Sequence, residues 1–321
     1  MKTTTKLSLA AVGAACALSA ASRYFYRFAV LKRKNYDNIW ASETKPQPYA
    51  KLRDCDREKV ARGIDFIFES RPEEITITSH EGLRLAGHFI PHENPKGIFV
   101  MVHGYRSNPS NDFSGAVLPI YNMGFSLLLI DHRAHGNSQG QHITFGVKER
   151  FDLVRWCRYL KKRFPDLPVV LDGVSMGAST VMLAAGLALP DNVKALIADC
   201  GYTSPAEICK HCLKKWYKLP PFPLFYTANS VVKKYAGFSL TDGDCREALS
   251  RNRLPILIAH GTADDFVPYR MGQENFEACR GSNAIFFSVT GAEHGMSYII
   301  DPEGYTEKMK ELFRMAGIEW E

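Results

Sequence analysis

Residues 173–177 read G-V-S-M-G, the composition and spacing of a nucleophile elbow, in which glycines flank a serine at a sharp turn. An apolar run at residues 169–171 precedes the motif, and a helix-length apolar segment from Ala178 follows it, which is the context that an elbow requires. Gly173 and Gly177 lack side chains that would collide across the turn. The motif therefore predicts Ser175 as the nucleophile of an acyl transfer.

A nucleophilic serine requires a base that removes its proton and an acid that orients the base. His294 follows the apolar run at residues 284–289, and we expect it to be the general base. His260 is the alternative, but it follows the run at residues 256–259 directly and precedes a glycine, which favours a structural role. Both runs are predicted strands, so both histidines fall on the sheet edge that carries Ser175.

The acid is expected in the loop at residues 260–268, which contains Asp264 and Asp265. Neighbouring side chains point in different directions, so only one of the two can face the imidazole, and Asp264 is the preferred choice. Asp199, at the end of an earlier apolar run, is a third candidate. The chain order of serine, acid and histidine favours a catalytic role over the turn or cap roles that single aspartates usually have.

Two backbone N–H groups are expected to stabilise the negative charge that develops on the substrate oxygen. The first belongs to Met176, directly after the nucleophile and at the start of the predicted helix. The second belongs to Tyr105, in the segment H-G-Y-R that follows the apolar run at residues 98–102. Gly104 would allow the backbone of this segment to approach the substrate closely.

The elements that must position these groups are short apolar runs, typical of buried strands, separated by amphipathic segments of helical length. The runs lie at residues 98–102, 126–130, 169–171, 193–198, 256–259 and 284–289, and two of the helical segments lie at residues 147–164 and 180–189. Segments at residues 74–78 and 83–90 predict a β-hairpin at one edge of the sheet. The pattern predicts an α/β fold with a mostly parallel sheet and helices on both faces.

This domain is predicted to span residues 74–321, after a polar connector at residues 35–73 with a helix around residues 56–70. Residues 202–250 interrupt the alternation and are rich in aromatic residues and proline. Because ligands bind beyond the carboxyl ends of parallel strands, an insertion there is predicted to be a helical lid over the site. The alternative is a surface excursion that only packs on the core.

The N-terminus carries the basic excess of the chain. The 321 residues have a formal net charge of +6, but residues 1–34 contain seven basic side chains and no acidic one. The remainder balances 33 basic against 34 acidic side chains, which argues against a nucleic-acid partner. An apolar run at residues 7–21 between basic residues predicts an uncleaved membrane anchor and an extracytoplasmic catalytic domain. A cleaved signal peptide and a secreted protein are the alternative.

The eight cysteines are scattered, and only Cys209 and Cys212 form a C-x-x-C pair, around His211. No second C-x-x-C pair accompanies it, so the pattern does not complete a common zinc-binding set. Three residues apart on a helix, the two cysteines are expected to pack on one face. Neither a metal site nor an organic cofactor is predicted.

Taken together, these segments resemble the α/β-hydrolase superfamily, specifically bacterial membrane-anchored members related to serine aminopeptidases and prolyl oligopeptidases. The resemblance covers residues 70–316. It rests on H-G-Y at 103–105, D-H-R-A-H-G-N-S at 131–138, the elbow at 173–177, D-C-G-Y-T-S at 199–204, H-G-T-A-D-D-F-V-P at 260–268 and A-E-H at 292–294. It implies Ser175, Asp264 and His294 as a catalytic triad, and structural roles for Asp131, Arg133 and Gly136.

The resemblance and the apolar insertion predict a carboxylesterase that cleaves an acyl ester, or a thioester, through an acyl-enzyme. The superfamily shares its fold across many substrates, so two alternatives stay open. One is a peptidase of the aminopeptidase type, which would cleave an amide. The other is a binding protein that keeps the fold without catalysis.

Overall fold

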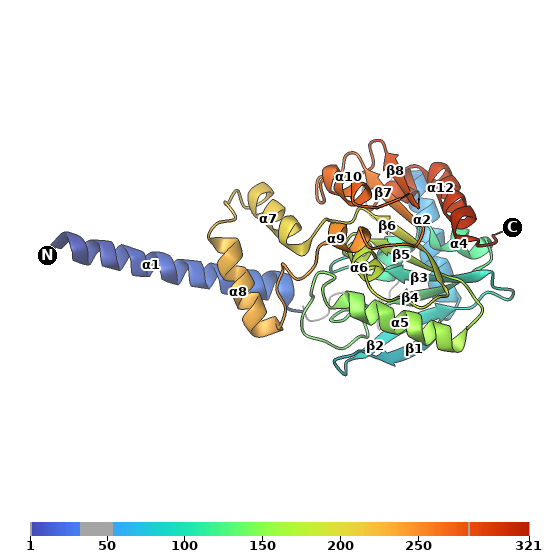
Figure 1. Cartoon of the computed structure of the whole chain (residues 1–321), viewed down its shortest axis with the longest axis horizontal. Coiled ribbons are helices and arrows are strands. Elements are labelled where there is room, and N and C mark those ends of the chain that lie inside the picture. The colour runs from blue at the N-terminus through green and yellow to red at the C-terminus, as the bar shows by residue number, and fades with distance from the viewer. Residues whose placement is uncertain (1, 33–53, 282, 321) are drawn as a thin grey trace.

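An eight-stranded sheet forms the centre of the protein in a computed structural model, which describes residues 2–32, 54–281 and 283–320 (Figure 1). The strand order is β1-β2-β4-β3-β5-β6-β7-β8. Strand β2 is antiparallel to β1 and β4, and the other neighbouring pairs are parallel. The strands are β1 (Glu73–Thr78), β2 (Arg84–Ile90), β3 (Gly97–Val102), β4 (Phe125–Ile130), β5 (Val169–Val174), β6 (Val193–Asp199), β7 (Ile256–Gly261) and β8 (Ala284–Val289). The predicted mostly parallel sheet with an edge hairpin is confirmed.

Helices cover both faces of the sheet, because successive side chains of a buried strand point to opposite sides. In β3, Ile98 and Val100 join an apolar cluster with α5, α6 and α9, whereas Phe99 and Met101 join a second cluster with α2, α4 and α12. The helical elements are α1 (Lys2–Phe25), the π-helical turn η1 (Tyr26–Val30), α2 (Asp54–Glu69), α3 (Pro109–Phe113), α4 (Val117–Asn122), α5 (Glu149–Arg163), α6 (Met176–Ala185), α7 (Pro205–Lys215), α8 (Leu224–Ala236), α9 (Cys245–Leu249), α10 (Tyr269–Glu277), α11 (Ser297–Ile300) and α12 (Pro302–Ala316).

The boundaries around the elbow differ from the sequence prediction. Strand β5 does not end at residue 171 but continues to Val174, because Asp172 and Gly173 still pair with Ile197 and Ala198 of β6. Helix α6 begins directly after the nucleophile, at Met176, two residues before the predicted start at Ala178, since the turn at Ser175 leads directly from strand to helix. An apolar run marks only the part of a strand with apolar side chains, whereas the backbone ladder extends through polar residues and glycine.

The segment preceding the sheet contributes a helix to the body. The helix predicted around residues 56–70 is α2, and its Ile67 is fully buried in the second apolar cluster. Helix α2 therefore covers part of one face of the sheet. The first part of the predicted connector, residues 35–53, lies outside the described residues.

The predicted insertion at residues 202–250 contains α7, α8 and α9. Helix α9 packs against α6, so it belongs to the body. Helices α7 and α8 lie beyond the end of β6, and α8 packs beside α1 (Figure 1). We refer to residues 205–236, which contain α7 and α8, as the cap.

Helix α1 extends away from the body on the side of the cap (Figure 1). Near the body it contacts α8, where the hydroxyl groups of Ser22 and Thr227 are hydrogen-bonded at 2.8 Å. Among the described residues, no helix is both long and apolar enough to cross a membrane.

The loop at residues 131–138, for which the resemblance implies a structural role, is tied to the sheet by buried polar contacts. The guanidinium of Arg133 donates two hydrogen bonds to the carboxylate of Asp152, at 2.6 and 2.8 Å. The hydroxyl of Ser138 donates to the carbonyl of Asp131 and accepts the N–H of Ala86 in β2. The buried charge of Arg133 is thereby paired, and the buried carboxylate of Asp131 accepts the backbone N–H of Asn137 at 2.8 Å, as a dry interior requires.

Gly136 makes the tightest turn of this loop, with φ of +43°, and a Cβ atom there would lie 2.2 Å from Asp131 Oδ2. We predict that Gly136→Ala lowers the free energy of unfolding by more than about 2 kcal/mol, since strain and a clash add together. Gly82→Ala is the control: its φ is +83°, but no atom lies within 4 Å, so only about 1–2 kcal/mol should be lost. Denaturant unfolding measures both, and equal losses would contradict the close approach.

Candidate active site

Ser175 occupies the single-residue turn between β5 and α6, with φ of +58° and ψ of −117°. This conformation is strained for a residue with a side chain, and it persists because the neighbouring glycines allow tight packing. A Cβ atom on Gly173 would lie 2.4 Å from the backbone of Gly177, and one on Gly177 would lie 1.7 Å from the carbonyl oxygen of Val102. The predicted elbow glycines thus permit both the turn and its contact with β3.

Ser175, His294 and Asp264 form a continuous chain of hydrogen bonds. His294 Nε2 lies 2.9 Å from Ser175 Oγ, and His294 Nδ1 lies 2.7 Å from Asp264 Oδ2. The loops after β7 and β8 carry the acid and the histidine to the edge of the sheet where β5 ends. The structure therefore brings together the three residues predicted from the sequence.

Hydrogen bonds and neighbouring histidines hold Asp264 as a carboxylate. Its Oδ1 accepts the backbone N–H groups of Phe266 and Val267, both at 2.9 Å. Burial alone would raise the pKa of Asp264, but hydrogen bonds and charge interactions with His260 and His294 outweigh it and hold this pKa well below its usual range. An ionised acid can stabilise the positive charge that a protonated imidazole carries.

The alternative candidates lie elsewhere. His260 is fully buried behind Asp264, with its Nε2 3.0 Å from the carbonyl oxygen of Val267, so it supports the acid loop rather than facing Ser175. Asp265 points to solvent, where its carboxylate lies 3.3 Å from Lys215 Nζ. Asp199 is buried, and its carboxylate accepts a hydrogen bond at 2.7 Å from the hydroxyl of Ser297, which follows His294 by three residues.

The loop after β3 lies against the nucleophile, as a close approach to a substrate would require. A Cβ atom on Gly104 would lie 3.2 Å from Ser175 Cβ. Asp112 holds this loop: its Oδ2 accepts the N–H of Gly104 at 2.6 Å, and its Oδ1 accepts the hydroxyl of Ser107 at 2.7 Å. Burial raises the pKa of Asp112, and these hydrogen bonds oppose the shift. The backbone N–H groups of Tyr105 and Met176 are the predicted oxyanion donors on either side of Ser175.

Asp112 is a site residue that sequence reasoning missed. It lies in a short helix of ordinary composition, eight residues from the N–H that it accepts, and only folding brings the two together. Three buried histidines of the sequence motifs, to which no role was assigned, lie beside the same loop, where the ring of His103 contacts those of His132 and His135 edge to face. Burial lowers the pKa of His132 to about 3 and that of His135 to about 4, so both are neutral and structural.

Cys200, Asp264 and His294 are the only described side chains grouped closely enough to suggest a metal site, with ligand atoms within 4.8 Å of one another. Their chemistry does not fit a metal ion. Burial raises the pKa of the Cys200 thiol well above its usual value, and both ring nitrogens of His294 already have hydrogen-bond partners. Cys209 and Cys212 lie together in an apolar cluster of the cap, in agreement with the packing interpretation.

Comparisons with known proteins identify the family of the chain. Residues 93–234 match the hydrolase family described as serine aminopeptidase, S33. The protein YqkD of Bacillus subtilis is 30% identical over 265 residues, which cover 81% of this chain and 86% of that protein. The chain belongs to the α/β-hydrolase superfamily. YfhR of Salmonella typhimurium is a more distant relative, 27% identical over 227 residues, with 65% of this chain and 70% of that protein covered.

Solved structures of α/β hydrolases share the fold. The esterase Pf2001 of Pyrococcus furiosus superposes with a TM-score of 0.62 at 21% identity, over 86% of this chain and 100% of that one. Est1E of Butyrivibrio proteoclasticus, solved with ferulic acid bound, superposes with a TM-score of 0.58 at 19% identity, over 75% of this chain and 99% of that one. At these identities the likeness concerns the fold alone.

Three carboxyl groups, two of them buried, line a small cavity of about 30 Å³ beside Val174, the residue before Ser175. They belong to Asp112, Asp172 and Asp199. Burial, and then the neighbouring Asp199 carboxylate, raises the pKa of Asp172 to about 8. Burial also raises the pKa of Asp199 to about 6, although the Ser297 hydroxyl and nearby histidines oppose the shift. The protein thus keeps costly acidic groups next to its site.

Asp172 makes the stability of the fold depend on pH. An unfolded aspartate has a pKa near 3.9, so between about pH 4 and pH 8 the folded protein holds a proton that the unfolded chain has released. The free energy of unfolding therefore falls as the pH rises through this window. We predict that Asp172→Asn raises the melting temperature, more at pH 8 than at pH 5. Asp166→Asn, at an exposed aspartate, is the control. A gain independent of pH would contradict the assignment.

Proposed function

We propose that this protein is a serine hydrolase that cleaves carboxylic esters or thioesters, with Ser175, His294 and Asp264 as its catalytic triad. The observation that carries the proposal is the chain of hydrogen bonds from Asp264 through His294 to Ser175, at 2.7 and 2.9 Å. Membership in the α/β-hydrolase superfamily supports hydrolase activity.

In the first step, Ser175 Oγ attacks the acyl carbon while His294 Nε2 removes its proton. Asp264 stabilises the imidazolium that forms. The N–H groups of Met176 and Tyr105 stabilise the negative charge on the carbonyl oxygen. Removing one donor of this kind lowers the rate of an enzyme about a hundredfold or more. His294 then protonates the leaving alcohol or thiol, and Ser175 keeps the acyl group. In the second step, water activated by His294 releases the acid and restores the serine.

The surroundings of the site favour an apolar acyl group over a peptide. Met176, Tyr105 and Phe266 lie in one apolar cluster with residues of the cap, such as Phe225 and Leu213. A peptide's amino terminus would need an acidic partner, but residues 208–241, which include most of the cap, contain six lysines and no acidic residue. Amide hydrolysis is thus the less favoured alternative.

We also propose that residues 1–34 hold the protein at a membrane, with the catalytic domain outside the cytoplasm. Basic residues flank an apolar run in this segment. In α1, the side chains of residues 12–17 are apolar or small and are exposed to solvent. Apolar helix surface of this kind is stable when a membrane or another apolar surface covers it.

Loss of the nucleophile or of the acid is predicted to abolish turnover of p-nitrophenyl esters. Ser175→Ala and Asp264→Asn should each lower kcat by about 10⁴-fold or more, because the triad acts as a unit. Asp265→Asn, at the exposed neighbour, is the matched control and should stay within about twofold of the wild type. Steady-state kinetics measures all four proteins.

A fluorophosphonate probe gives an independent readout, since it should label the wild type at Ser175 and leave Ser175→Ala unlabelled. Equal labelling of both proteins would contradict the assignment of Ser175 as the nucleophile. Labelling of neither would favour a binding protein without catalysis. Aminoacyl p-nitroanilides tested in parallel should be cleaved far more slowly than the esters. Faster cleavage of the anilides would reverse the preference for ester substrates.

The membrane proposal predicts the behaviour of two forms of the protein in a fractionated cell. The full-length chain should sediment with the membranes, because its N-terminal apolar segment partitions there. A form that begins at residue 35 should stay in the supernatant. Immunoblotting of both fractions measures the distribution. Recovery of both forms in the supernatant would end the anchor proposal.

A further inference from the structure

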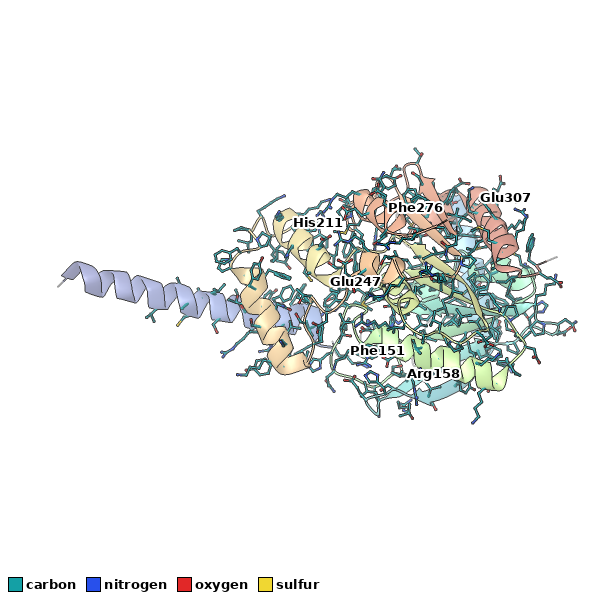
Figure 2. The ribbon with its side chains drawn as sticks, in the orientation of Figure 1. Phe151, Arg158, His211, Glu247, Phe276 and Glu307 are labelled. Atoms are coloured by element: carbon teal, nitrogen blue, oxygen red, sulfur yellow. The ribbon has the colours of Figure 1, made fainter. Side chains whose placement is uncertain are left out.

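The exposed apolar side chains of the described residues gather at one end of the molecule. Eleven large hydrophobic residues are exposed, and nine of them lie on α1, on η1 or in the cap. These nine are Val12, Tyr24, Phe28, Trp216, Tyr217, Leu219, Phe222, Tyr226 and Tyr235. Figure 2 shows the side chains of α7 and α8, including His211 on α7, at the end from which α1 extends, whereas Glu307 on α12 lies at the other end. We call these nine residues the apolar face; surfaces of this kind mark interaction sites.

The same end carries a one-sided charge. Residues 208–241 contain six lysines without an acidic residue, and the described residues 2–32 contain five basic residues without an acidic one. Residues 35–207 and 242–321 together contain 27 basic and 34 acidic side chains, so the excess of positive charge belongs to the N-terminal segment and to residues 208–241. A partner of this surface should therefore be negatively charged as well as apolar.

Lysines and aromatic rings are interleaved here as they are in segments that lie at a bilayer surface. Lys210 Nζ lies 5.9 Å from the ring centre of the exposed Tyr226, and Lys234 Nζ lies 5.4 Å from that of Tyr235. Aromatic rings prefer the headgroup region of a bilayer, and lysine stems cover apolar surface while their ammonium groups reach the phosphates. An anionic lipid surface provides both the apolar layer and the negative charge.

Helix α1 and the cap form one continuous structure at this end. The rings of Tyr26 in η1 and Tyr235 in α8 lie 5.6 Å apart, and the Tyr26 hydroxyl is 2.9 Å from His142 Nε2 in the body. Wherever α1 enters a membrane, α8 must follow it to the surface. The membrane proposed for residues 1–34 would therefore lie against the cap.

The apolar face also connects with the catalytic residues. The ring of Trp216 lies 4.8 Å from that of Phe266, which in turn lies 4.8 Å from the ring of His294. On the other side, Val30 is fully buried in the cluster that contains Met176. The Tyr105 hydroxyl donates to the carbonyl of Ala29 at 2.9 Å. A single side chain, Phe266, therefore separates Trp216 of the apolar face from His294. The segment after α1 contacts Tyr105, in the loop beside Ser175.

We propose that the apolar face docks on an anionic bilayer and that the substrates are long-chain lipid esters taken from that bilayer. The substrate class rests on the esterase function proposed above. The ester bond between acyl carbon and alcohol oxygen breaks, the alcohol leaves with the proton that His294 carries, and water then releases the fatty acid from Ser175. The bilayer contact brings the acyl chain to the cap without exposing it to water.

Docking is tested with full-length protein on vesicles of phosphatidylglycerol and phosphatidylcholine whose acyl chains carry bromine, a quencher of tryptophan fluorescence. Trp216 is one of four tryptophans, so the Trp216→Phe variant provides the signal of the other three. The fluorescence of Trp216, obtained by subtracting the signal of the variant from that of the wild type, should be quenched on anionic vesicles. This quenching should become weaker in the double variant Lys214→Ser, Lys218→Ser. An unquenched Trp216 would overturn the docking proposal, whatever the enzyme activity.

The substrate class is tested by comparing lipid esters in vesicles with a short soluble p-nitrophenyl ester. The double variant Leu219→Ser, Phe222→Ser removes two exposed side chains of the apolar face and should lower turnover in vesicles about tenfold or more. Turnover of the soluble ester should stay unchanged. Met315→Ser, at an exposed apolar position on α12, is the control and should change neither.

The outcomes separate the two proposals. If the wild type cleaves the soluble ester but the double variant loses no vesicle turnover, the lipid proposal is wrong and the esterase proposal stands. If the wild type cleaves neither ester and takes no fluorophosphonate label, the esterase proposal is wrong, and the quenching of Trp216 still decides docking. A lipid-free dimer, seen by light scattering and lost in the double variant, would assign the apolar face to a second copy of the chain instead.

Discussion

The strained turn at Ser175 is the constraint on which the rest of the structure depends. A positive φ at a residue with a side chain costs free energy, and the turn persists because Gly173 and Gly177 allow β5, α6 and β3 to approach more closely than any Cβ atom would permit. The nucleophile therefore lies at the end of an interior strand, β5, and the loops after β7 and β8 bring its partners to it. Moving the turn by one residue would place a side chain inside the backbone of β3.

The groups around this turn are held by buried polar contacts, and several of these contacts are costly. Asp112 fixes the loop that approaches Ser175, Ser297 links the histidine loop to Asp199, and His260 lies behind Asp264. The raised pKa values of Asp172 and Asp199 show that the fold keeps carboxyl groups where water cannot solvate them well. Loss of stability near a functional site is a common consequence of positioning polar groups there.

The N-terminal segment connects the site to the outside of the molecule. Val30 and Ala29 contact the residues around the elbow, whereas α1 extends beyond the cap with an exposed apolar surface. A single stretch of chain thus reaches from the interior to the proposed membrane surface. This arrangement gives a physical reason for the aromatic and basic composition of the cap, which a purely structural excursion on the core would not need.

The order of strands and helices, the elbow and the three catalytic candidates could be predicted from the sequence, because each leaves a local mark: an apolar run, a glycine spacing, or a polar residue directly after a strand. Four features required the tertiary structure. They are the hydrogen bonds that hold the preferred acid Asp264 in place, the role of Asp112, the burial of α2 against the sheet, and the packing of α1 and η1 against the cap. Each depends on contacts between residues that are distant in the chain or on which way a side chain points, and neither property changes the local pattern of residue types. The sequence by itself determined which residues could carry out the chemistry, and only the folded chain decided which of them meet.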